Sequence, residues 1–219
     1  MLRALGSPTS FAGLLVGFLV ALVASAYAQA GTARLLGDRA AVRRVGGLRQ
    51  VLDPFGAVAA LLGGPGWGVT PEIPLRSRGR LAVALLAGPV VVALLGVLAL
   101  LGFIAVGGDR SSIAGAGITD VLGNVNLPSG QAFFISLSLE LMAMAVLAVV
   151  PLPPLPGWRL LELASTGSLG WQRARHYLVD NNLGVLALLV LLILPLGGSH
   201  PPLLLILDSV LGSVLTAIA

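Results

Sequence analysis

Only a few side chains within the long apolar stretches of this chain could do chemistry. Glu140 lies near the middle of one stretch and Asp208 lies in another, while Ser25 and Gln29 stand four residues apart in the first stretch. Carboxyl groups within a membrane mark proton paths, partner contacts or hydrogen-bonded structural sites, and hydroxyl and amide groups hydrogen-bond between helices. The chain has no Cys, which excludes disulfides, thiolate metal sites and cysteine nucleophiles.

Glu140 carries the strongest of these signals, because an ionised carboxylate near the middle of a membrane helix costs several kcal/mol unless it is paired or protonated. Three interpretations follow: a protonated or hydrogen-bonded Glu that faces the helix bundle, a contact with a partner subunit, or a step of a proton path. Asp208 allows the same three interpretations. Which one holds depends on what surrounds each carboxyl group.

Two further stretches have the residue order of an intramembrane metal site. Residues 25–30 read Ser-Ala-Tyr-Ala-Gln-Ala and are followed by Leu-Gly-Asp at 36–38, and residues 148–159 read Ala-Val-Val-Pro-Leu-Pro-Pro-Leu-Pro-Gly-Trp-Arg. In this order, on apolar helices, they resemble the motifs of the site-2 protease family of intramembrane zinc metalloproteases. That family has His-Glu-x-x-His-Ala followed by Leu-Gly-Asp at the first place, and Asn-x-x-Pro-x-Pro-x-Leu-Asp-Gly at the second.

Three segments between these stretches continue the resemblance. Residues 52–56, Leu-Asp-Pro-Phe-Gly, resemble the family's Ile-Asp-Pro-Ile-Gly, and residues 66–71, Gly-Trp-Gly-Val-Thr-Pro, resemble its Gly-Trp-Ala-Lys-Pro-Val-Pro. Residues 87–89 are the same Ala-Gly-Pro that the family has early in its next helix. The five landmarks follow the family's order over residues 25–159, so the set is more specific than any one of them.

The resemblance implies that the residues of the zinc site are missing. The family's two His fall on Ser25 and Gln29, its Glu on Ala26, its Asp ligand on Pro156 and its Asn on Ala148. A catalytic zinc takes three protein ligands and needs a base for its bound water. Ser and Gln are poor zinc ligands and Ala cannot accept a proton. We therefore expect a pseudoprotease with no catalytic residue, no metal and no cofactor.

The composition excludes a soluble globule, since 57% of the residues are hydrophobic, 10% are charged and the mean hydropathy is +0.99. A bilayer is crossed by about 20 apolar residues in a helix. The sequence thus predicts an all-α integral membrane protein with one membrane domain over residues 1–219. Its expected membrane helices cover residues 11–30, 81–106, 131–150, 183–196 and 202–219.

The first long loop is expected to return toward the membrane. Residues 56–64 are apolar but too short to span, and the Gly and Pro residues of 64–71 cannot continue a helix. A short apolar piece between such breakers is typical of a re-entrant or interfacial segment that neighbouring helices shield.

The charges of the loops predict the orientation. Residues 31–80 contain eight Arg against three acidic residues, and residues 151–182 contain three Arg against two, whereas residues 107–130 hold one Arg against two Asp. The positive-inside rule puts both basic loops in the cytoplasm, with the N-terminus outside and the C-terminus inside. We expect a multi-pass protein of a bacterial plasma membrane.

The first helix carries a ridge of small residues, Gly13, Gly17 and Ala21, which continues through Ser25 to Gln29 at every fourth position. Such ridges let membrane helices approach closely. The ridge could pack on the chain's own second or third helix, or contact a partner.

The leading functional hypothesis is a catalytically inactive, accessory subunit of a membrane protein complex, with other integral membrane proteins and the lipid bilayer as its partners. One alternative is a transporter or proton-path component that uses Glu140, and another is an active intramembrane protease with an unconventional site. Nucleic acid is not an expected partner, because the net charge of +4 comes largely from one Arg-rich loop and reports topology.

The orientation can be tested with single cysteines at Arg43 and Ser112, because the native chain has none. An impermeant thiol reagent added outside intact cells should label position 112 and leave position 43 unlabelled. Labelling of position 43 from outside would contradict the predicted topology.

Overall fold

The computed structural model describes residues 1–109, 117–122, 127–165, 167–195 and 200–218. Ser112, which the orientation test uses, lies outside these ranges. The described chain is helical, apart from loops and one isolated antiparallel bridge between Leu52 and Gly68. Its helices are η1 (Leu2–Gly6), α1 (Pro8–Leu35), α2 (Ala41–Arg44), α3 (Leu48–Val51), α4 (Pro54–Gly63), α5 (Arg78–Ala105), α6 (Ile118–Leu122), α7 (Ser129–Val149), α8 (Pro156–Ala164), α9 (Leu169–Arg175), η3 (His176–Asp180), α10 (Leu183–Ile193) and α11 (Pro202–Ile218).

Within the described residues, three helices are long and apolar enough to cross a membrane. They are α1 and α5, with 28 residues each, and α7, with 21 residues. A helix rises about 1.5 Å per residue, so each can traverse the hydrocarbon core. A bent pair, residues 169–180 with α10, gives a fourth candidate span. The prediction of an all-α, multi-pass membrane protein is confirmed.

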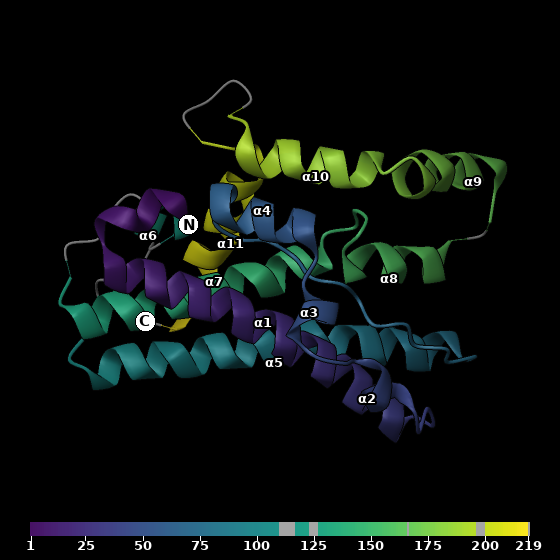
Figure 1. Cartoon of the computed structure of the whole chain (residues 1–219), viewed down its shortest axis with the longest axis horizontal. Helices are drawn as coiled ribbons and strands as arrows, with labels where there is room; N and C mark the ends of the chain where they lie inside the picture. Colours follow the sequence, from purple (N-terminus) through teal and green to yellow (C-terminus); the bar gives the residue numbers. More distant parts are fainter. Residues whose placement is uncertain (110–116, 123–126, 166, 196–199, 219) are drawn as a thin grey trace.

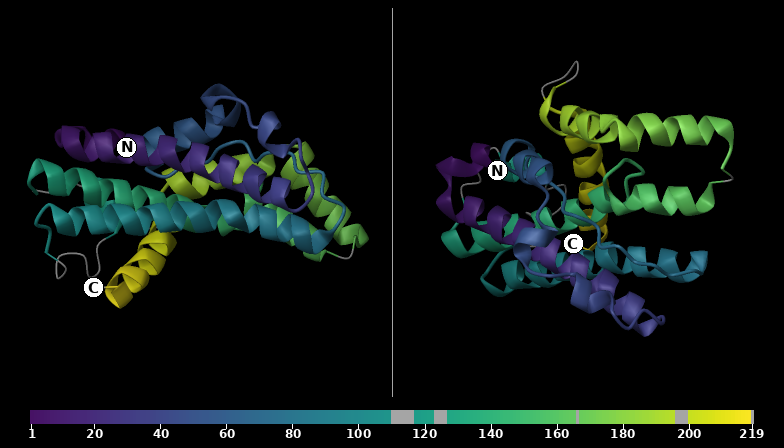
Figure 2. Two further views of the ribbon diagram at one scale, coloured as in Figure 1. Left: turned by 90° about the horizontal axis from the view of Figure 1, so that it is seen from below. Right: turned by 45° about the vertical axis from the view of Figure 1, so that its right-hand side comes forward.

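The last two of the five expected spans differ from the prediction. Helix α10 has only 11 residues, because Asn182 before it has a left-handed backbone and the chain leaves the helix at Leu194, next to Pro195. Helix α11 is a shorter apolar helix, and it runs steeply across α5 and α7 rather than alongside them (Figure 2). The described chain therefore has three long spans, or four if the bent pair counts as one.

Helices α1, α5 and α7 pack together along most of their length (Figure 1). Their contact depends on glycines. A Cβ at Gly13 would lie 2.4 Å from the Phe133 carbonyl oxygen, and one at Gly17 would lie 3.0 Å from Cβ of Glu140. Ala21 is also buried. The small-residue ridge of α1 thus packs on the chain's own α7, which agrees with the first of the two alternatives, packing on the chain's own second or third helix.

The loop between α1 and α5 contains the predicted short apolar segment as helix α4. The side chain of Asp53 caps α4 by accepting a hydrogen bond from the backbone N–H of Gly56 at 2.9 Å. After Gly64 the chain has no helix until α5 and runs back beside Val51, where the Val69 N–H donates to the Val51 carbonyl at 2.8 Å. This segment, residues 64–77, connects α4 with α5.

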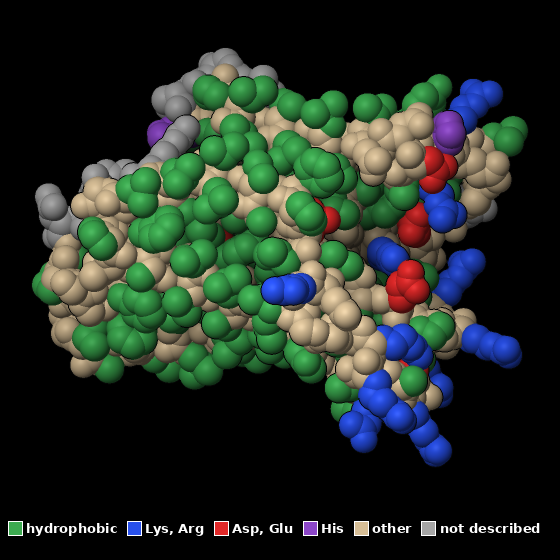
Figure 3. Space-filling view, viewed as in Figure 1, with side chains coloured by type: hydrophobic (Ala, Val, Ile, Leu, Met, Phe, Trp, Pro, Cys, Tyr) green, Lys and Arg blue, Asp and Glu red, His purple; other side chains and the backbone are tan. Residues whose placement is uncertain are grey.

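Charged residues gather at one end of the bundle. Figure 3 shows Arg side chains projecting from the end where α2 lies, while the flank of the bundle is largely hydrophobic. Helices α8 and α9 lie at this same end (Figure 1), as expected if both basic loops share one side. Here Arg44 binds Asp38 with two contacts of 2.8 Å, and this hydrogen-bonded guanidinium lowers the pKa of the Asp38 carboxyl.

The glycine contact gives a prediction with a matched control in the same helix. Gly13→Ala should lower the free energy of unfolding by about 1–3 kcal/mol, because the added methyl group meets backbone that cannot shift. Gly31→Ala, where nothing lies within 4 Å, should be neutral or stabilising. Thermal unfolding in detergent measures both. Equal stability of the two variants would show that α1 and α7 do not pack at Gly13.

Candidate functional site

The five positions that the family resemblance singled out surround one small cavity of about 50 Å³. Ser25, Ala26 and Gln29 reach it from α1, Ala148 from the last turn of α7, and Pro156 from the start of α8. These positions are up to 131 residues apart in sequence (156 minus 25). The fold therefore brings together the segments that would hold a metal in the family.

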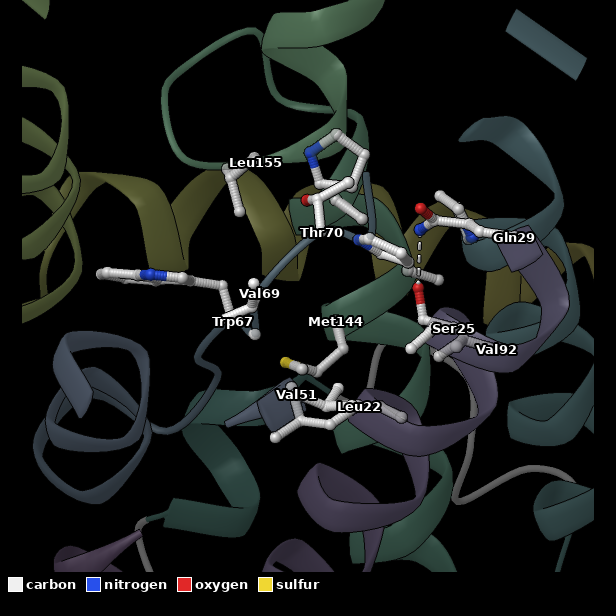
Figure 4. A pocket seen from close by; sticks show the side chains of 18 of the residues that line it. Leu22, Ser25, Gln29, Val51, Trp67, Val69, Thr70, Val92, Met144 and Leu155 are labelled. Carbon is white, nitrogen blue, oxygen red and sulfur yellow. Dashed lines mark hydrogen bonds between the residues drawn. The ribbon is translucent and has the colours of Figure 1, made fainter. Parts of the chain in front are cut away.

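The other walls come from the extended segment and from α5. Residues 66–71 pass along the cavity, with Val51 beside them, and Pro89 and Val92 close it from α5. Met144 lies just above Val51 and Leu22 in the view of Figure 4, and its sulfur accepts a hydrogen bond from the Gly66 N–H at 3.3 Å. Four of the sequence landmarks, at residues 25–30, 66–71, 87–89 and 148–159, thus supply wall residues.

The polar groups of the cavity are few and neutral. Gln29 is buried, and its Nε2 donates to Ser25 Oγ at 3.1 Å, as the dashed line in Figure 4 shows. This bond uses only the amide nitrogen of Gln29, so Oε1 stays available to accept a hydrogen bond. Within the described part of the chain, neither Gln29 Oε1 nor Thr70 Oγ1 has a hydrogen-bond partner. A bound group that donates hydrogen bonds would satisfy both.

Ionisable side chains are missing from the walls that the structure describes. No Asp, Glu, His, Arg or Lys is among the lining residues, and the described residues contain no cluster of three or more His, Cys, Asp or Glu that could hold a metal ion. The side chains that are present can form hydrogen bonds and apolar contacts. They cannot supply a proton acceptor for water or the ligand set of a catalytic zinc.

Gly88 explains how α5 closes on the cavity. A Cβ at this position would lie 2.5 Å from both Gln29 Nε2 and Ser25 Oγ. Only a glycine lets α5 approach this polar pair so closely. The Ala-Gly-Pro landmark therefore marks a packing contact of the site.

Glu140 lies away from the cavity, on α7 opposite Gly17. Its side chain is fully buried, and neither carboxyl oxygen has a hydrogen-bond partner among the described residues. An ionised carboxylate in this position would be expensive, so the neutral acid fits the surroundings. Of the three interpretations, this position agrees with a protonated Glu that faces the helix bundle.

Asp208 has a structural partner. Its Oδ1 accepts a hydrogen bond from the Ile118 N–H at 2.7 Å, and its Oδ2 accepts one from the Thr119 hydroxyl. The carboxylate of α11 thereby caps the first turn of α6. Of the three interpretations for Asp208, these contacts agree with a hydrogen-bonded structural group. They also connect α11 with α6.

A larger chamber of about 440 Å³ adjoins the cavity. The two share Gly68, Val69, Thr70 and Leu155 as walls. No feature of the sequence predicts the chamber, because many of its walls come from α8, η3 and α10, whose mutual arrangement depends on tertiary packing.

Comparisons with protein-family models, with curated proteins and with solved structures found no match for this chain.

Because the lining of the cavity holds no His, Asp, Glu or Cys, we expect the purified protein to contain little zinc. Elemental analysis should find far less than about one zinc per chain, since three ligands are required. About one zinc per chain, lost on Ser25→Ala with Gln29→Ala, would overturn this prediction.

The same geometry predicts that a zinc site can be rebuilt. Ser25→His, Ala26→Glu, Gln29→His and Pro156→Asp together should take up about one zinc per chain, because all four positions line one cavity. The matched control carries the first three changes and keeps Pro156, and it should bind zinc more weakly.

Proposed function

We propose that this chain is a catalytically inactive membrane protein similar to the site-2 protease family and acts by binding other integral membrane proteins. One observation carries the proposal: the five positions equivalent to the family's zinc-site residues line one cavity, and its lining includes no ionisable side chain. Their convergence supports the family resemblance. The missing ligands and base support a role without catalysis.

The proposed binding role is supported by the surfaces that the helices offer to other membrane proteins. Three long apolar helices make up much of its described part, and they offer extended surfaces for contact within the membrane. The ridge of α1 is used internally, whereas the outer face of α5 carries exposed leucines. There Leu94, Leu98 and Leu101 are 58%, 60% and 54% exposed. Polar contacts between membrane helices contribute only about 0.6–2 kcal/mol each, so a stable complex needs several contacts together.

In this proposal the Arg-rich end faces the cytoplasm of a bacterium and the protein is a subunit of a plasma-membrane complex. The excess of Arg in both loops at that end supports the orientation.

Transport is the second candidate, because Glu140 is a buried carboxyl group without a described partner. Glu140 is not among the residues that line the cavity or the adjoining chamber, which counts against a continuous proton path. Glu140→Gln should leave proton and solute flux into vesicles unchanged, and a large loss of flux would favour transport.

The binding role is tested by a photo-crosslinking residue at Leu98, with Leu100 as the control. Leu98 is 60% exposed and Leu100 is 1% exposed on the same helix. In cells, position 98 should crosslink to other integral membrane proteins and position 100 should not. The proposal fails if the wild-type chain is a lone monomer in mild detergent and position 98 captures no protein.

A further inference from the structure

The chamber of about 440 Å³ combines apolar and charged walls. Val69 on its wall is 47% exposed, so the chamber opens to the surface. Its apolar walls include Leu155, Leu178 and Val185. Its charged side chains are two arginines and two carboxylates: Arg159, Arg175, Asp53 and Glu162. Small-molecule ligands occupy spaces of about 300–1,000 Å³ with mostly apolar walls and a few polar groups. The chamber therefore has the size and composition of a site for an amphiphilic ligand.

The two carboxylates of the chamber have partners in the chain. Asp53 Oδ1 accepts the hydrogen bond that caps α4, and Glu162 Oε1 lies 3.4 Å from Arg175 Nε. Arg159 is exposed, and no ion pair or hydrogen bond joins its guanidinium to the described residues. Guanidinium groups bind phosphate and carboxylate oxygens through two parallel hydrogen bonds. Arg159 is thus available to an anionic group from outside the chain.

A groove of about 700 Å³ adjoins the chamber and adds a second arginine of this kind. The two spaces share Glu162 and Arg175, and Arg78 lines the groove. Arg78 is exposed and, like Arg159, lacks an ion pair or hydrogen bond within the described chain. Chamber and groove together hold three arginines against two carboxylates. The combined site therefore favours a ligand with negative charge.

Both spaces lie where the long membrane helices end. Helix α5 begins at Arg78, α7 ends at Val149, and α8 begins soon after it at Pro156. Helices α8 and α9 lie at the Arg-rich end of the bundle (Figure 1). There Trp158 and Trp171 stack with ring centroids 5.0 Å apart. Tryptophan is enriched at membrane–water boundaries. The site is therefore at the level of the lipid headgroups.

The apolar walls of the chamber continue along α10. This helix contributes Val185 to the chamber and runs back along the bundle (Figure 1). Leu183 and Leu186 on it are 43% and 56% exposed. A lipid with its phosphate at the arginines would lay its acyl chains along this surface.

The tryptophan between chamber and groove has a polar atom that such a lipid can satisfy. Trp158 lines the chamber and is 5% exposed, and its Nε1 has no hydrogen-bond partner among the residues described. Buried N–H groups are usually hydrogen-bonded. Phosphate and ester oxygens of a phospholipid are acceptors for this group.

We propose that the chamber and the groove together bind one anionic phospholipid of the surrounding bilayer. Arg159 and Arg78 bind its phosphate group, and the apolar walls hold the upper part of its acyl chains. Basic pockets between helices at a membrane boundary bind anionic headgroups in this way. The site concerns a lipid and not a protein partner, so its test succeeds or fails independently of the proposed binding role.

Quenching of tryptophan fluorescence tests the site, because Trp158 and Trp171 are two of the three tryptophans of the chain. The purified protein is placed in phosphatidylcholine vesicles that contain a small fraction of phosphatidylglycerol with brominated acyl chains, which quench only at short range. This lipid should quench several-fold more than the same fraction of brominated phosphatidylcholine. Arg78→Gln with Arg159→Gln should weaken the binding of phosphatidylglycerol about tenfold, because two positive charges near its phosphate are lost.

A matched control separates a site from general attraction to the Arg-rich end. Arg39→Gln with Arg43→Gln removes the same charge from two exposed arginines that line neither space. This pair should change the quenching by less than about twofold, because exposed charges are screened by salt. Equal quenching by the two lipids, or equal losses in the two double variants, would overturn the proposal. Relief of the quenching by inorganic phosphate would also overturn it, since the arginines would then take a soluble anion in place of a lipid.

Discussion

The close backbone approach of α1 to α7 is the contact on which the rest of the structure depends. Lipid offers apolar side chains as good a surrounding as another helix does, so membrane helices associate through tight packing and hydrogen bonds. Gly13 and Gly17 provide that packing against α7, and Gly88 provides it between α5 and the polar pair of α1. Larger residues at these positions would separate the three helices and move the walls of the cavity apart.

The cavity lies where α1, α5 and α7 meet residues 66–71 and the start of α8. Residues 66–71 occupy the space beside α1 and α7, fixed by the Val69–Val51 hydrogen bond and by the contact of Gly66 with Met144. The start of α8 adds Pro156. Because the walls are neutral, hydrogen-bond acceptors such as Gln29 Oε1 are the strongest features that an occupant would meet. Shape and hydrogen bonding, rather than charge, would decide what fits there.

Much of this arrangement could be predicted from the sequence, for identifiable reasons. Long apolar runs predict α1, α5 and α7, and the order of the landmarks predicts that residues near Ser25 and Pro156 belong to one site. The course of α11 could not be predicted, because it depends on the hydrogen bonds of Asp208 to α6. The partner of the Gly13 ridge was also ambiguous, since a small-residue ridge has the same sequence whether a neighbouring helix is internal or belongs to another chain. Apolar wall residues such as Leu22 and Met144 give no signal that distinguishes them from ordinary core.

The central claim is that α1 and the end of α7 meet around one cavity whose lining holds no ionisable side chain. The most direct measurement is proximity crosslinking in native membranes with a short bifunctional thiol reagent, since the chain contains no Cys. Ser25→Cys with Ala148→Cys should be bridged within one chain, because both positions line the cavity. Ser25→Cys with Ala105→Cys, at the far end of α5, should not be bridged. Failure of the first pair, or equal bridging of both, would contradict the convergence and the pseudoprotease proposal that depends on it.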